Sequence, residues 1–204
     1  ALWHPHDTVI ASAYDTPIIG WQAGWANTLR LWAAKPTELF DLAHFNRGDY
    51  LAASQPEALA RTLSRVLYPD DTTDSGRELR LKQEYFFTSA SIQDILRRYR
   101  SEYDDLARLP DHVAIQLNDT HPALAGPELV RLLVDEHEMD FDTAIETAQG
   151  CLAYTNHTLL PEALERWAEP MFARLLPRHR QIVEKIDEWH ARKTAAKGGG
   201  DVRI

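Results

Sequence analysis

Polar side chains that can bind ligands or move protons follow two short apolar runs in the second half of the chain. Residues 112–117 are mostly apolar and continue directly into Asn-Asp-Thr-His-Pro at residues 118–122. Residues 151–155 form a second apolar run, which Asn-His-Thr at residues 156–158 follows. In open α/β sheets, ligands collect beyond the carboxyl ends of parallel strands. If both runs are parallel strands, these polar side chains converge at one edge of a sheet.

Three kinds of chemistry are compatible with this group. One carboxylate with two histidines has the composition of a metal site, although no histidine pair has the i, i+4 spacing of a metal-binding helix. Asp119 could also act with a loop acid such as Asp71 in general acid–base catalysis, as paired carboxylates do in glycosidases. Alternatively, Asp119, Thr120, Asn156 and Thr158 only cap helices, and the histidines bond to backbone carbonyls. The residue pattern leaves these alternatives open.

Helical patterns around the two apolar runs indicate how they are placed. Residues 128–134 have helical spacing and lie between the runs, and a helical crossover makes the two predicted strands parallel. Asp140 is expected to cap a further helix, and Pro161 to open the next one. A last helix is expected over residues 170–192, broken or restarted at Pro177.

The start of the chain has the pattern of β-structure. Residues 9–14 and 28–32 predict two antiparallel strands, with turn chemistry in Asp-Thr-Pro at residues 15–17. Together with the helices and parallel strands of the second half, this pattern predicts an α/β fold that opens with an antiparallel β-hairpin.

Two helices with a polar loop between them are expected in the middle of the chain. Ser54 and Glu57 have the spacing of a capping box, which predicts a helix from there to about Leu67. Residues 69–75 contain no aliphatic side chain and form a loop, and residues 79–99 have helical spacing.

Composition limits the partners. The chain has 22 Lys and Arg against 31 Asp and Glu, a net charge of −9 and a pI near 5.4, so nucleic acid and anionic membranes are not expected partners. No apolar run approaches the roughly 20 residues that span a bilayer. The single Cys151 cannot form an intramolecular disulfide, which suggests a reducing compartment, and the expected location is the cytoplasm.

The chain resembles the α-glucan phosphorylases, the family of glycogen, starch and maltodextrin phosphorylases. The resemblance covers roughly residues 8–190. It rests on strings that look like the family in the same order: RVLYP at 65–69, ELRLKQEYF at 78–86, NDTHP at 118–122, AYTNHT at 153–158, LPEALERW at 160–167 and LPRH at 176–179.

This resemblance implies part of a two-lobed glycosyltransferase of the GT-B type with Rossmann-like halves. The family cleaves a terminal α-1,4-linked glucose from a glucan with inorganic phosphate and releases glucose 1-phosphate, with pyridoxal phosphate as cofactor. Residues 1–192 are expected to belong to the later part of the N-terminal lobe, and residues 193–204 to form a flexible linker or tail. The cofactor lysine is expected outside this chain, so the chain alone is predicted to be inactive, and the full-length enzyme is expected to be a homodimer.

The resemblance also implies roles for individual residues. His157 is the expected catalytic residue, because its backbone carbonyl would meet the glucose and the charge that develops at its ring. The loop at residues 70–72 matches the gate over the catalytic cleft; the family commonly has Asn-Asp-Asn there, so Thr72 lacks an amide that could contact the sugar. No cofactor-binding residue and no metal ligand is expected. The expected substrate-binding residues are Asp71, Thr72, Asp119, His121, Asn156, Thr158 and Glu165.

An alternative from another functional class is a sugar-binding or subunit-interface module that keeps the fold of the lobe without catalysis. A reading frame that continues past Ile204 into a cofactor domain would favour the enzyme, whereas a stop codon there would favour the module.

Overall fold

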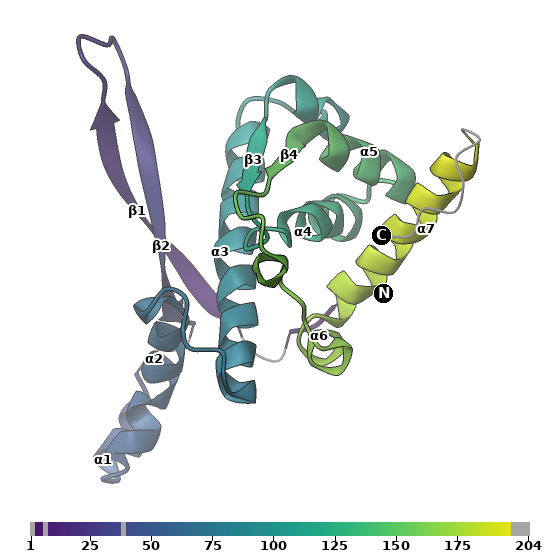
Figure 1. Ribbon diagram of the computed structural model, residues 1–204. Coiled ribbons are helices and arrows are strands. Elements are labelled where there is room, and N and C mark those ends of the chain that lie inside the picture. Colours follow the sequence, from purple (N-terminus) through teal and green to yellow (C-terminus); the bar gives the residue numbers. More distant parts are fainter. Residues whose placement is uncertain (1–2, 6–7, 38–39, 197–204) are drawn as a thin grey trace. The chain divides into compact units, whose positions relative to one another are not determined.

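The computed structural model describes residues 3–5, 8–37 and 40–196 (Figure 1). The chain divides into two compact units, one of residues 4–90 and one of residues 1–3 together with 91–204. Within the described residues, no helix is both long and apolar enough to cross a membrane. The expected mixed α/β architecture is confirmed: a β-hairpin comes first, then helices and a small parallel sheet.

The hairpin in the unit of residues 4–90 is longer than the sequence predicts. Strands β1 (Val9–Ile19) and β2 (Ala26–Pro36) pair antiparallel over their whole length. The predicted turn at residues 15–17 is wrong, because these residues lie inside β1. Arg30 donates to both carboxylate oxygens of Asp15 across the strands, at 2.7 and 2.6 Å. Pro17 is tolerated because each strand of a two-stranded ribbon has one edge without a ladder partner.

One face of this hairpin carries large apolar side chains. Side chains of alternate residues point to the same face of a strand, and the register brings the apolar ones of the two strands together. These side chains are between 49% and 60% exposed: Ile10, Tyr14, Ile18, Leu29 and Leu31.

Helices α1 (Leu42–Asn46) and α2 (Tyr50–Arg65) follow the hairpin. The capping box predicted at Ser54 is wrong, because α2 begins earlier: the carboxylate of Asp49 accepts a hydrogen bond from the amide of Ala52 at 3.2 Å. Ser54 and Pro56 therefore lie inside the helix, which ends two residues before the expected Leu67. The loop that follows is confirmed, and helix α3 (Asp74–Arg100) begins five residues before the predicted start.

The two predicted parallel strands are confirmed in the second unit. Strand β3 (Ile115–Asn118) pairs with β4 (Leu152–Thr155), and Ile115 lies opposite Leu152. The 3-10 turn η1 (Leu106–Asp111) precedes β3, while α4 (Ala125–Arg131), the π-helical turn η2 (Leu132–Glu136) and α5 (Phe141–Cys151) connect the strands. Asp140 caps α5 as predicted, since its carboxylate accepts from the amide of Thr143.

The C-terminal part differs from the expectation in two places. The helix expected to open at Pro161 is only a 3-10 turn, η3 (Pro161–Ala163). Helices α6 (Glu169–Leu175) and α7 (Pro177–Ala196) confirm the interruption at Pro177. Because α7 continues to Ala196, the first residues of the expected tail are helical, and residues 197–204 of that tail lie outside the described residues.

The core of this unit combines apolar packing with a buried group of charges. Leu109, Leu129, Leu133, Ala144 and Ile182 are all at most 1% exposed. Such dense packing against apolar neighbours makes charges nearby costly unless they are paired.

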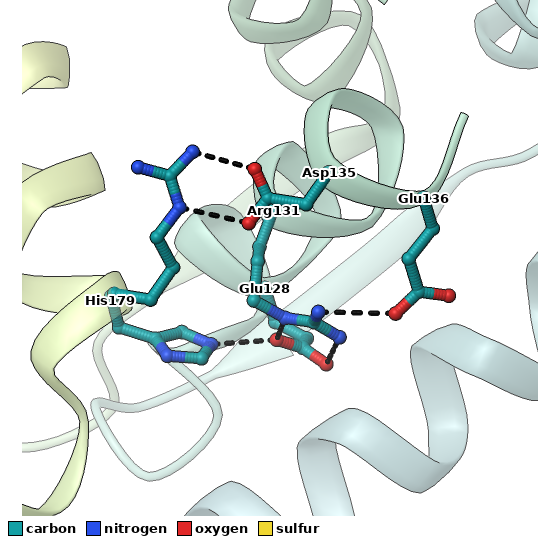
Figure 2. Close-up of polar contacts among 6 residues, drawn as sticks. Glu128, Arg131, Asp135, Glu136 and His179 are labelled. Atoms are coloured by element: carbon teal, nitrogen blue, oxygen red, sulfur yellow. Dashed lines mark hydrogen bonds and ion pairs between the residues drawn. The ribbon is translucent and has the colours of Figure 1, made fainter. Parts of the chain in front are cut away.

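Figure 2 shows how the buried charges are paired. Both carboxylate oxygens of Glu128 on α4 accept from the guanidinium of Arg131, at 2.8 and 3.0 Å, and Nε2 of His179 on α7 lies 2.6 Å from the same carboxylate. Arg178 donates to both oxygens of Asp135 at 2.8 and 2.6 Å. These contacts fix α7 against α4 and η2.

Candidate functional site

The parallel pairing of β3 and β4 brings two polar segments to the same edge of the sheet (Figure 1). Asn118 and Thr155 end the two strands and lie opposite each other. The ladder continues one step further, because the amide of Asp119 donates to the carbonyl of Thr155 at 2.8 Å. The residues that follow both strands therefore emerge together, as the sequence predicts.

Asp119 connects these two segments. Its Oδ1 accepts a hydrogen bond from the backbone amide of His157 at 2.7 Å, and Nδ1 of the same histidine lies 3.4 Å from this oxygen. The carboxylate thus holds the main chain of His157 more closely than its ring. The ring is 56% exposed, whereas the Asp119 side chain is 28% exposed.

Electrostatics at this position favour the carboxylate form of Asp119. The hydrogen bond from the backbone amide of His157 is the main cause that lowers its pKa, and the rings of His157 and His121 add to the effect. A lowered pKa favours the carboxylate, which accepts hydrogen bonds, and disfavours Asp119 as a general acid. His121, half-buried, lies close enough to Asp119 to contribute to this shift.

Glu165 joins the same edge through Thr120. The hydroxyl of Thr120 donates to Oε2 of Glu165 at 2.9 Å, and the carbonyl of Ala163 lies 3.4 Å from the same hydroxyl. The helix predicted from Pro161 does not reach Glu165, which lies in the irregular segment after η3. Thr120 orients this carboxylate, whereas the sequence pattern predicts only a helix cap there; the position of Thr120 within the NDTHP string is the signal that points to the site.

Asn156 and Thr158 form the turn that carries His157. Oδ1 of Asn156 accepts from the backbone amide of Thr158 at 3.3 Å, and both residues are exposed. This short-range bond closes the turn around His157. The structure therefore brings together His157, Asp119, Asn156, Thr158 and, through Thr120, Glu165.

Asp71 and Thr72 lie in the unit of residues 4–90, so the geometry of their loop is described separately from that of the sheet edge. The carboxylate of Asp70 accepts from both the amide and the hydroxyl of Thr72, at 2.8 and 2.5 Å, and these bonds lower the pKa of Asp70. Asp71 forms an ion pair with Arg80 at 2.8 Å. The hydroxyl of Thr72 is thus already used within the loop.

These contacts bear on the chemistries that the sequence left open. Helix capping is wrong for Asp119 and Thr120, because the next helix, α4, begins at Ala125, and no side chain caps its N-terminus. The lowered pKa of Asp119 disfavours it as the proton donor of a carboxylate pair. Across residues 3–5, 8–37 and 40–196, no three His, Cys, Asp or Glu side chains gather in a way that could hold a metal ion. The arrangement that the structure shows is a set of fixed hydrogen-bonding groups around an exposed turn.

Comparison with known proteins identifies the relatives of the chain. The sequence model of a family described as carbohydrate phosphorylase matches residues 1–204. Brain-form glycogen phosphorylase of Rattus norvegicus is 51% identical over 98% of this chain, and glycogen phosphorylase of Haemophilus influenzae is 52% identical over 92% of it. Glycogen phosphorylase of Chlamydia trachomatis is 49% identical over 95% of the chain. The matched regions make up 25%, 23% and 24% of these relatives, so the chain spans about a quarter of their length.

Proposed function

This chain belongs to the carbohydrate phosphorylase family, and we propose that it supplies glucose-binding residues to an α-1,4-glucan phosphorylase. The whole enzyme would release glucose 1-phosphate from the non-reducing end of a glucan with inorganic phosphate. The observation that carries this proposal is the bond between Asp119 and the amide of His157, which fixes the exposed turn at the sheet edge. The matching glycogen phosphorylases align with nearly the whole length of the chain, and the aligned region includes this turn.

The turn can act on a sugar through its main chain. Cleavage of a glycosidic bond leaves positive charge at the sugar ring, and a fixed carbonyl dipole stabilises such charge. The peptide that carries the carbonyl of His157 donates its N–H, from Thr158, to Asn156. This donation draws electron density toward the carbonyl oxygen, since hydrogen bonds along a chain polarise one another. His157 would therefore offer its carbonyl, and Asp119 would hold that carbonyl in place.

Glu165, His121 and the loop residues Asp71 and Thr72 complete the proposed substrate contacts. Glu165 is oriented by Thr120, and a carboxylate can accept hydrogen bonds from sugar hydroxyls. Thr72 uses its hydroxyl within the loop, so the contribution of this segment would come from Asp71 and the main chain.

Pyridoxal phosphate belongs to the proposed activity of the whole enzyme, and enzymes hold it through a lysine. The described lysines do not fit this role: Lys82 pairs with Glu78 at 2.8 Å, Lys193 pairs with Glu146 at 2.7 Å, and no lysine in the described ranges is buried. We therefore propose that residues outside those described hold the cofactor, and no step at this sheet edge passes through it.

The same family membership supports the remaining proposals. Residues 1–192 would form part of the N-terminal lobe of a GT-B enzyme, to which the hairpin and the parallel sheet contribute. The substrates would be an α-1,4-glucan and inorganic phosphate, the full-length enzyme would be a homodimer, and the single, buried Cys151 suits the reducing cytoplasm.

The apolar face of the hairpin supports a second candidate function, an interface module without catalysis. Large apolar side chains that share one exposed face are typical of protein contact surfaces. The two candidates differ in whether the protein that carries this chain performs chemistry.

Incubation of maltoheptaose with the full-length protein that carries this chain, pyridoxal phosphate and inorganic phosphate separates these functions. We expect glucose 1-phosphate, formed only when phosphate is present. Formation of free glucose instead would identify a hydrolase, and absence of any product would favour the interface module.

A further inference from the structure

The loop between α2 and α3 is anchored where it leaves α2. The side-chain amide of Gln83, which is 2% exposed, donates to the carbonyls of Leu63 and Val66 at 2.9 and 2.8 Å. Its carbonyl oxygen accepts from the amide of Tyr68 at 3.1 Å. Tyr68 has a φ of 55°, a left-handed conformation that a bulky residue adopts only when its surroundings fix it. One residue of α3 thus fixes the entry of the loop.

The same loop is packed directly against the start of α3. A Cβ atom on Gly76 would lie 2.0 Å from the carbonyl oxygen of Asp70, so the two main chains approach too closely for any other residue. The loop therefore has little space to move toward the helix at this point.

Two arginines of α3, which lie one turn apart, hold Asp71 between these anchors. Arg77 donates to the backbone carbonyl of Asp71 at 3.1 Å, and Arg80 donates to its carboxylate at 2.8 Å. The Arg80 guanidinium also lies 3.6 Å from the buried carboxylate of Glu84 and 5.7 Å from the centre of the Tyr68 ring. The arginine side chain is 20% exposed, whereas the Asp71 side chain is 52% exposed. Arg80 is thus the more fixed partner, and Asp71 is fixed through it.

We propose that Arg80 is a positioning residue that holds Asp71, and with it the loop at residues 68–73, in the conformation used for glucan binding. The link to glucan binding rests on the proposed function, whereas the hold on the loop does not. Arg80 links the entry of the loop to its middle, because it contacts both Tyr68 and Asp71. Arg77 supports the main chain of the same residue but does not reach its carboxylate.

Hydrogen exchange of peptides from residues 68–76 tests the hold on the loop in the purified chain. Arg80→Gln should raise the exchange rate about three- to fivefold, as expected for loss of a partly exposed ion pair. Arg80→Lys should give a smaller increase, because an ammonium can pair with Asp71 but lacks the planar guanidinium that also reaches Tyr68 and Glu84. Arg61→Gln is the matched control, since Arg61 forms a surface ion pair with Glu57 on α2.

A variant that leaves the buried Glu84 paired protects this test against general destabilisation. Asp71→Asn keeps the contact between Arg80 and Glu84, so its unfolding temperature should equal that of the Arg61→Gln control. We expect Asp71→Asn to raise loop exchange as Arg80→Gln does, and the double variant to add nothing further. Loop exchange in Arg80→Gln that equals the control, or additive effects of the two substitutions, would overturn the proposal.

The link to substrate is tested by steady-state kinetics of the full-length protein. Arg80→Gln should raise the KM for maltoheptaose with little change in kcat, because a loosened loop weakens ground-state and transition-state binding alike. Arg80→Lys should restore part of the affinity. Faster loop exchange with an unchanged KM would contradict the role of Arg80 in glucan binding. A wild-type protein that shows no phosphorolysis would contradict the proposed function, and the exchange experiment alone would then test whether Arg80 holds the loop.

Discussion

At the scale of single residues, the candidate site depends on how Asp119 is held. Its φ of 61° places it in the left-handed region, which aspartate tolerates better than most residues. This conformation follows directly after β3 and turns the carboxylate toward the amide of His157. One residue therefore ends a strand, changes the direction of the chain and fixes the neighbouring turn.

The first prediction concerns the ring of His157. His157→Ala should keep most of the glucan affinity, because Asp119 binds the backbone amide at 2.7 Å and the ring lies further away, at 3.4 Å. The backbone carbonyl remains in the variant. Calorimetric titration with maltoheptaose measures this affinity, and a loss as large as that of Asp119→Ala would show that the ring itself contacts the sugar.

The second prediction concerns the pH dependence of stability at Glu128. Burial alone would raise its pKa, but hydrogen bonds from His179 and Arg131 outweigh this effect and lower the pKa to about 2 from 4.5. Because the pKa is lower in the folded state, the stabilisation is complete above pH 4.5 and is lost as the pH falls toward 2. It amounts to something on the order of 3 kcal/mol.

Denaturation with urea between pH 2 and pH 7 measures this effect. Glu128→Gln should lower the free energy of unfolding at pH 7 by about 3–5 kcal/mol, because it leaves buried charges without their partner. This substitution should also reduce the pH dependence of the free energy of unfolding below pH 4.5. Glu146→Gln, which breaks an exposed pair with Lys193, should do neither; equal pH profiles of the two variants would contradict this account.

Sequence reasoning reached part of the site at this scale. Asp119 and His157 could be placed together, because the ends of parallel strands coincide. The hydrogen bond between Thr120 and Glu165 could not be predicted, because the segment after Pro161 has a helix-like composition. Only the folded chain shows that the helical turn stops at Ala163. The pairing of Glu128 with His179 joins residues 51 positions apart, which no local pattern indicates.

At the scale of elements, two of the misplaced boundaries have clear physical causes. Asp15 and Pro17 have turn composition, yet the ion pair of Asp15 with Arg30 stabilises the strand across them. Asp49 caps α2 before Ser54 can do so. In both cases a contact with another residue decided between two local patterns of similar strength. The apolar residues of α3, in contrast, keep helical spacing over many turns, so the sequence alone predicts that a helix forms there.

The third prediction concerns Gln83, which connects α3 to the end of α2. Gln83→Leu should lower the free energy of unfolding by about 1–3 kcal/mol, because it removes three part-buried hydrogen bonds to the backbone of Leu63, Val66 and Tyr68. Gln55→Leu, at an exposed position of α2, should change it little. Thermal unfolding of both variants provides the comparison, and equal unfolding temperatures would show that Gln83 is not an anchor.

At the scale of the whole molecule, binding and catalysis are expected to separate. The fourth prediction is that the purified 204-residue chain forms no glucose 1-phosphate from maltoheptaose and phosphate, even with pyridoxal phosphate added. Contacts that bind a sugar do not replace the acid and the phosphate positioning of the transition state. Chromatographic detection of glucose 1-phosphate measures this activity, and any phosphate-dependent product would show that these residues suffice for catalysis.

The role of Asp119 in fixing the glucose-binding turn is tested most directly by the affinity of the full-length protein for maltoheptaose. This affinity is determined by calorimetric titration in wild type and variants. We predict that Asp119→Ala weakens binding about tenfold or more, because the turn at His157 loses its charged acceptor. Asp119→Asn should weaken it less, since an amide oxygen can still accept from the His157 amide. Asp142→Asn removes a surface partner of Arg192 and should leave the affinity unchanged. An Asp119→Ala variant that binds maltoheptaose as tightly as Asp142→Asn would contradict the account.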